Sequence, residues 1–113
     1  MFISGLFFAT AALSLPSAGE LQEVASAAGA AAAGFHLCGD QSKAKKIKAK
    51  FQDVADTCTT TKPATRAALN AFDLGYVNTM NSFSQQGGSC KGNNQARFET
   101  LMDVLGRAED DCL

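Results

Sequence analysis

Residues 44–58, AKKIKAKFQDVADTC, have the pattern of an amphipathic helix that ends at a cysteine. Apolar side chains recur in this stretch at steps of three and four residues, at Ala44, Ile47, Phe51, Val54 and Cys58. That spacing places them along one face of an α-helix. Asp40 or Ser42 can cap the start of the helix. The threonines at 59–61 disfavour its continuation, so Cys58 is predicted to lie at its C-terminal end.

The same periodicity on both sides of this stretch predicts three more helices. They begin near Glu20, near Pro63, and at Asn93 or Asn94. Their apolar faces are formed by Leu21, Val24, Ala28, Ala31 and Phe35, by Ala68, Leu69, Phe72, Tyr76, Met80 and Phe83, and by Phe98, Leu101, Met102, Leu105 and Cys112. No segment alternates apolar and polar residues as a strand does. The predicted fold class is all-α, and the short connections favour antiparallel neighbours in an up-down-up-down four-helix bundle.

Each of the four cysteines lies at or just beyond the end of a predicted helix, at Cys38, Cys58, Cys90 and Cys112. In an up-down-up-down bundle these ends alternate, which places Cys38 and Cys90 at one end and the other two cysteines at the opposite end. A helix of about 17 residues spans about 25 Å, whereas a disulfide needs Cα atoms within about 7 Å. The predicted bundle is therefore stapled by two disulfides, Cys38–Cys90 and Cys58–Cys112.

The first 19 residues have the layout of a secretory signal peptide. Residues 1–19 carry no charged side chain, residues 2–15 are almost wholly apolar, and small residues precede Glu20. A signal peptide over 1–19 and a disulfide-bonded helical domain over 20–113 are predicted, with a periplasmic or secreted location that agrees with the cysteine content. Stable membrane insertion is not expected after signal cleavage, because the apolar run is short for a span.

Three alternatives stay open at this end of the chain. Cleavage after Ala27 or Ala30 would also follow small residues, but it would destroy the first amphipathic helix. An uncleaved anchor is the second alternative. No Lys or Arg follows Met1, so either the true start lies upstream or the signal is weak.

Composition argues against several classes of function. The net charge of −1 does not suit a dedicated nucleic-acid binder. The chain has one histidine, His36, and its cysteines lack metal-site spacing, so neither a metal nor another cofactor is predicted. No Ser-His-Asp arrangement or phosphate loop is evident, and no catalytic residue is assigned. We expect the protein not to be an enzyme.

Two surface features are candidate binding sites. A docking patch for an anionic partner could be formed by Lys43, Lys45, Lys46, Lys48 and Lys50, although a solvated helix face is the simpler interpretation. A small-ligand notch could be formed by Phe72, Gly75, Tyr76 and Met80. Gly75 has a structural interpretation as well, because a glycine within a helix permits a close crossing against the Ala/Gly-rich residues 27–34.

Two short motifs, Leu37-Cys38-Gly39 and Phe72-x-x-Gly75-Tyr76, resemble a family of small exported all-helical proteins of Gram-negative bacteria that has no assigned function. The likeness spans residues 21–90. Such proteins often carry an arginine-rich stretch after the Gly-Tyr pair, where this chain has residues 77–80, VNTM. The resemblance implies export and a helical fold, and it implies no catalytic residue.

The leading functional hypothesis is a non-enzymatic exported protein that binds another, unidentified protein. A more specific alternative is a periplasmic immunity or inhibitor protein directed against an envelope toxin or enzyme, since rigidity lowers the entropic cost of binding. A second class is a small apolar-ligand carrier, with a pocket lined by Phe72, Tyr76, Met80 and Phe98.

Overall fold

The structure is a computed structural model that describes residues 18–86 and 94–113. Four helices and no strand are present in these two ranges, which confirms the all-α prediction. The helices are α1 (Ala18–Leu37), α2 (Gln41–Cys58), α3 (Lys62–Gln86) and α4 (Asn94–Asp111). Most of the predicted signal peptide lies outside the described residues.

The helix ends follow from local sequence. Gly39 adopts a positive φ of 86° after α1 and donates its N–H to the carbonyl of His36 at 3.1 Å, a conformation that suits glycine. Asp40 caps α2, because its carboxylate accepts the N–H of Lys43. Thr61 accepts the N–H of Ala64 at 3.2 Å through its side chain, at the start of α3. Pro63 lies in the first turn of α3, where its missing N–H costs nothing.

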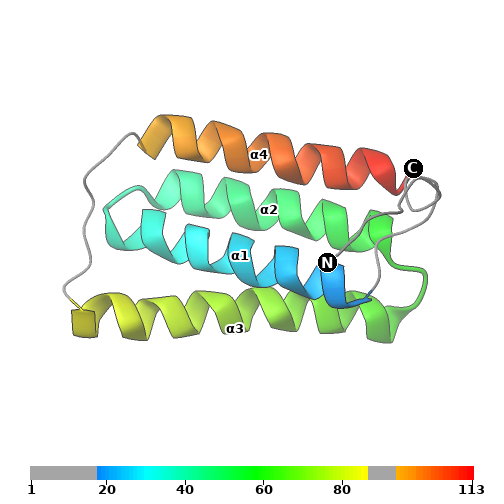
Figure 1. The fold of residues 1–113 in the computed structure, drawn as a ribbon, viewed down its shortest axis with the longest axis horizontal. Coiled ribbons are helices and arrows are strands. Elements are labelled where there is room, and N and C mark those ends of the chain that lie inside the picture. Colours follow the sequence, from blue (N-terminus) through cyan, green and yellow to red (C-terminus); the bar gives the residue numbers. More distant parts are fainter. Residues whose placement is uncertain (1–17, 87–93) are drawn as a thin grey trace, which may run out of the picture.

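The helices lie side by side in the order α4, α2, α1 and α3 (Figure 1). α1 packs most extensively against α3, next against α2, while α4 packs against α2. Helices that are consecutive in sequence are therefore not always the main neighbours. The short connections led us to expect that consecutive helices would be neighbours. α3 and α4 differ from this expectation, because they lie at opposite edges of the layer.

The core is centred on α2. Its residues Ile47, Phe51 and Val54 are fully buried, as is Leu105 of α4. α1 contributes mainly small buried residues to this core, at Ala25, Ala28, Ala32 and Ala33. Small side chains on α1 allow both α2 and α3 to approach it closely.

The closest approach lies between α1 and α3, at Gly29 and Gly75. A Cβ atom on Gly29 would overlap the carbonyl oxygen of Phe72, and one on Gly75 would overlap the carbonyl oxygen of Ser26. Backbone meets backbone here, so neither position has room for a side chain. Gly75 thus lies at a helix crossing against the Ala/Gly-rich part of α1.

One of the two predicted disulfides is present. Cys58, at the end of α2, is bonded to Cys112, just after α4, with 5.1 Å between the Cα atoms. This confirms the predicted Cys58–Cys112 pair. The predicted Cys38–Cys90 pair involves Cys90, which lies outside the described residues, so this pair stays a prediction.

The contacts of α4 show that it runs parallel to α2. Near the two N-termini, the Lys43 ammonium lies 5.8 Å from the ring centroid of Phe98. At the two C-termini, Cys58 is bonded to Cys112. The same pairing brings Lys50 to Glu109, with 2.7 Å between Nζ and Oε1.

Candidate functional site

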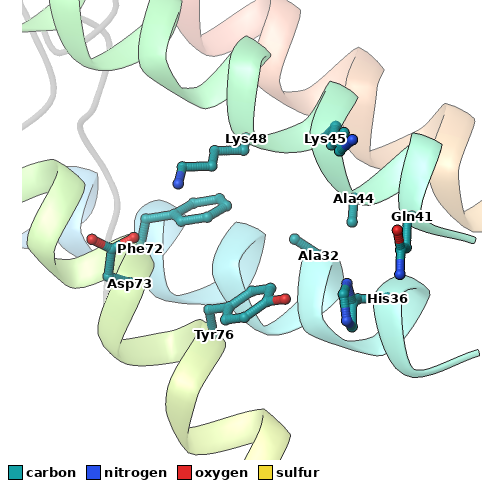
Figure 2. A pocket seen from close by; sticks show the side chains of 9 residues that line it. All are labelled: Ala32, His36, Gln41, Ala44, Lys45, Lys48, Phe72, Asp73 and Tyr76. Atoms are coloured by element: carbon teal, nitrogen blue, oxygen red, sulfur yellow. The ribbon is translucent and has the colours of Figure 1, made fainter.

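A cleft of about 300 Å³ opens where α1, α2 and α3 meet (Figure 2). Each of the three helices contributes to its lining, which is made by Ala32, His36, Gln41, Ala44, Lys45, Lys48, Phe72, Asp73 and Tyr76. We refer to this hollow as the cleft. Its volume lies at the lower limit of the range usual for small-molecule sites.

The cleft exists because of how the helices are arranged. α2 and α3 both pack on α1, but they make few contacts with each other. Ala32 of α1 and Ala44 of α2 line the cleft, and their side chains are too small to fill the space between the helices. The crossing at Gly29 and Gly75 holds α3 close to α1, so the opening lies on the side facing α2.

The middle of the cleft is apolar. Phe72 is 3% exposed and its ring stacks on that of Phe51, with centroids 5.5 Å apart and 21° between the planes. Stacking on a fully buried residue fixes the Phe72 ring in place. Ala32 and Ala44 complete this apolar part.

Polar side chains mark one end of the cleft. The Tyr76 ring lies edge-to-face with the His36 ring, with centroids 6.2 Å apart. Figure 2 shows the Tyr76 hydroxyl directed toward His36, with the Gln41 amide close by. None of the three side chains makes a hydrogen bond with the described part of the chain, so their polar atoms are available to a ligand.

Charged side chains mark the rim. Lys45 and Lys48 project from α2, and Asp73 projects from α3; all three are exposed. In Figure 2, Lys48 extends across the opening toward the side where Phe72 and Asp73 lie. Neither of these lysines forms an ion pair within residues 18–86 and 94–113. The rim therefore carries two lysines against one aspartate, an excess of one positive charge.

The five lysines of the candidate docking patch differ in whether they form an ion pair within the chain. Lys43 forms an ion pair with Asp40 at 2.6 Å, and Lys50 forms one with Glu109 at 2.7 Å. Lys45, Lys46 and Lys48 are exposed and lack such a partner in the described ranges. Two members of the patch are thus neutralised within the chain, and only the middle three could serve an anionic partner.

Both intramolecular pairs shift a pKa. The hydrogen bond from the Lys43 ammonium lowers the pKa of Asp40 below its ordinary value of 3.8. The hydrogen bond to the Glu109 carboxylate raises the pKa of Lys50 above its ordinary value of 10.5. Each pair therefore favours the charged state of both partners at neutral pH.

The residues of the candidate ligand notch separate in the structure. Phe72 and Tyr76 line the cleft, whereas Gly75 lies on the face of α3 that meets α1. Met80 is half-buried and is not part of the lining. Phe98, which was predicted to line the pocket of an apolar-ligand carrier, instead packs edge-to-face on Phe35, with centroids 5.9 Å apart.

Five lining residues were not assigned to either candidate binding site from the sequence: Ala32, His36, Gln41, Ala44 and Asp73. Their spacing could have drawn attention to them, because Ala32 and His36, Gln41 and Lys45, and Phe72 and Tyr76 are each four residues apart on one helix face. The spacing does not predict which faces of the three helices meet.

A second hollow, of about 460 Å³, lies along α4 beside Ala96, Arg97, Thr100, Leu101 and Val104. All of these lining residues belong to one helix, so the hollow is an open surface without opposing walls. No group of three or more His, Cys, Asp or Glu side chains in the described ranges is arranged to hold a metal ion. The cleft is therefore the better candidate for a binding site.

Comparison of the chain with protein-family models, curated proteins and solved structures finds no match. The resemblance to small exported helical proteins of Gram-negative bacteria accordingly stays a prediction. None of the helices in residues 18–86 and 94–113 has the length and hydropathy that crossing a bilayer requires.

Proposed function

We propose that this chain is an exported, non-enzymatic protein that acts by binding another protein through the face that contains the cleft. The observation that carries the proposal is a concave, apolar site with two rim lysines that form no ion pair with the described residues. Interfaces of this kind place an apolar centre inside a polar border. Hot-spot residues of a partner usually enter well-packed pockets of this type.

Exposed apolar residues on α3 also support protein binding. Leu74 and Val77 of this helix are 61% and 51% exposed. Such side chains would add apolar area to a contact with another protein. A single small ligand would leave that area uncovered.

We further propose the complete architecture as an up-down-up-down four-helix bundle with a second disulfide, Cys38–Cys90, and a periplasmic or secreted location. The Cys58–Cys112 disulfide supports that location, because disulfides persist in oxidising compartments. A constrained scaffold would present the cleft with little loss of conformational entropy on binding.

Site-specific photo-crosslinking tests the proposed binding face. A photoreactive residue is placed at Gln41 or at Asp73, on opposite walls of the cleft, and in a control at Arg107, whose side chain is 77% exposed on α4. In envelope extract from the source organism, we expect both cleft positions to yield an adduct of the same mass and the control to yield none. No adduct, or equal adducts from all three positions, would contradict the proposal. Identifying the adduct would also decide whether the partner is a toxin or enzyme, as the immunity or inhibitor alternative requires.

A small apolar-ligand carrier is the second candidate, and the cleft volume of about 300 Å³ favours it. Phe72 and Tyr76, two of the four residues assigned to that pocket from sequence, do line the cleft. Native mass spectrometry of the protein purified from its source tests this candidate. A retained small molecule that is lost from an Ala44→Phe variant would support the carrier function.

A further inference from the structure

We propose that the cleft recognises an acidic polypeptide segment with an aromatic side chain, the ring entering the apolar middle and the neighbouring carboxylates binding Lys45 and Lys48. This inference rests on the proposed protein-binding function and specifies the chemistry of the partner. Two independent observations carry it: the shape and apolar character of the cleft, and the two lysines at its rim, which form no ion pair within residues 18–86 and 94–113.

The apolar middle of the cleft suits a ring. Its volume of about 300 Å³ equals the liquid volume of roughly ten water molecules, which leaves room for one aromatic side chain but not for a folded element. Phe72 and Tyr76 offer rings on the α3 side, while Ala32 and Ala44 leave the space between them open. Aromatic pairs in offset or edge-to-face geometry add about 0.5–1.5 kcal/mol beyond the burial of their area.

The charge at the rim favours carboxylates on the partner. Lys45 and Lys48 are three residues apart on α2, a spacing at which like charges repel. Lys43 and Lys50 of the same helix are each paired with a carboxylate of the chain. A carboxylate of the partner would pair with Lys45 or Lys48, as Asp40 pairs with Lys43 and Glu109 pairs with Lys50.

The far end of the cleft suits a polypeptide backbone. Tyr76, His36 and Gln41 present a hydroxyl, an imidazole and an amide, groups that can both donate and accept hydrogen bonds. A backbone on either side of the inserted ring carries N–H and C=O groups that need such partners. The cleft thus has an apolar centre, a basic rim and hydrogen-bonding side chains at one end, as an aromatic residue with an acidic neighbour requires.

The chain contains a suitable probe of this site. Tyr76 is the only tyrosine and there is no tryptophan, so tyrosine fluorescence arises from the cleft alone. Blocked peptides Asp-Phe-Glu, Asn-Phe-Gln and Asp-Ala-Glu contain neither fluorophore and vary the ring and the charges separately. Phenylacetate represents the same chemistry in a free small acid.

We expect Asp-Phe-Glu to change the Tyr76 emission in a saturable way, and each of the other two peptides to bind about tenfold or more weakly. Equal affinity for Asn-Phe-Gln would overturn the role of the rim lysines. Equal affinity for Asp-Ala-Glu would overturn the inserted ring. Binding of phenylacetate as tight as that of Asp-Phe-Glu would overturn a polypeptide ligand and point to the small-ligand carrier.

Variants of exposed residues test the same contacts without disturbing the core. Lys45→Glu combined with Lys48→Glu should weaken Asp-Phe-Glu binding about tenfold, as expected for two charge pairs near the surface. Lys46→Glu is the matched control, because Lys46 is exposed on the same helix but does not line the cleft. Asp73→Asn should strengthen binding severalfold, since it removes the opposing carboxylate. Equal loss in Lys46→Glu and the double variant would show that binding is non-specific, and would overturn the inference.

Failure of this inference is distinguishable from failure of the proposed function. If no peptide binds but photo-crosslinking from Gln41 and Asp73 still captures one partner, protein binding stands and the acidic-aromatic chemistry is wrong. If neither peptides nor crosslinking report on the cleft, both proposals fail.

Discussion

The ammonium nitrogen of Lys50 lies 2.7 Å from Oε1 of Glu109, across 59 residues of sequence. Glu109 also accepts a hydrogen bond from the Thr57 hydroxyl at 3.4 Å, so one carboxylate joins the middle and the end of α2 to the last turns of α4. This contact and the Cys58–Cys112 disulfide fix the C-terminal halves of the two helices in parallel.

A double-mutant cycle of Lys50→Gln and Glu109→Gln should give a coupling of about 0.5 kcal/mol in the free energy of unfolding, as expected for a partly exposed pair. Because the folded-state pKa of Lys50 is raised above 10.5, its contribution is complete below pH 10.5 and is lost as pH rises through the higher folded-state value. Denaturant unfolding at neutral and alkaline pH measures both effects. A cycle on the exposed Arg107–Asp103 pair is the control and should give less; equal coupling in the two cycles would contradict the prediction.

Gly29→Ala and Gly75→Ala should each destabilise the fold by about 1–3 kcal/mol, because the added methyl group meets backbone that cannot move aside. Alanine normally favours a helix over glycine by about 1 kcal/mol. Gly34→Ala and Gly106→Ala are the controls, since a Cβ there has nothing within 4 Å, and they should stabilise the protein. Chemical denaturation of the four variants checks the difference in sign, and stabilisation by all four would show that the α1–α3 crossing is looser than described.

Replacing both Cys58 and Cys112 with Ala should lower the free energy of unfolding by about 4 kcal/mol, because the bond closes a loop with a sequence separation of 54. This is a large fraction of the total stability of about 5–15 kcal/mol for a typical domain. Equilibrium unfolding in denaturant, compared with the wild-type protein under non-reducing conditions, measures the loss. A change below about 1 kcal/mol would mean that the denatured chain is already constrained in this region.

Peptide mapping under non-reducing conditions should yield Cys58 linked to Cys112, and Cys38 linked to Cys90 as the second predicted pair. The second link follows from the alternation of helix ends in the proposed topology. A peptide that joins Cys38 to Cys58 would exclude that topology, because Cys38 precedes α2 and Cys58 is its last residue.

The cap of α2 should make stability depend on pH in the acidic range. The Lys43 hydrogen bond lowers the folded-state pKa of Asp40 below 3.8, so the stabilisation is complete above pH 3.8 and is lost as pH falls through the lower folded-state value. Asp40→Asn keeps a capping side chain but removes this charge. The melting temperatures of the wild-type protein and this variant should differ at neutral pH and converge in acid, and a constant difference would contradict the prediction.

Much of the fold could be predicted from the sequence because it depends on local patterns. The faces of α2 and α4 follow from apolar residues three and four apart, and the alternation of helix ends identified Cys112 as the partner of Cys58. The glycine in α3 correctly indicated a close helix crossing. Each of these features is determined by neighbours in the chain or by the length of a helix.

The candidate site could be predicted only in part, because it depends on which helices meet. Periodicity does not reveal that α2 and α3 pack on α1 while making few contacts with each other, and the cleft results from that arrangement. Nor does it reveal that Lys50 lies beside Glu109, which removes one lysine from the predicted patch. Phe72 and Tyr76 were identified, but their connection with Lys45 and Lys48 needed the tertiary structure.

The preference of α1 for α3 has a consequence for how the chain folds. α2 separates these partners in the sequence, so the face of α1 that contains Ser26 and Gly29 emerges from the ribosome before α3 has followed. A bundle built only from sequential hairpins folds through local contacts, whereas the α1–α3 contact of this one closes a loop that contains a whole helix. We therefore expect folding to be slow for a helical domain of this size, and the early chain to need protection from association through that face.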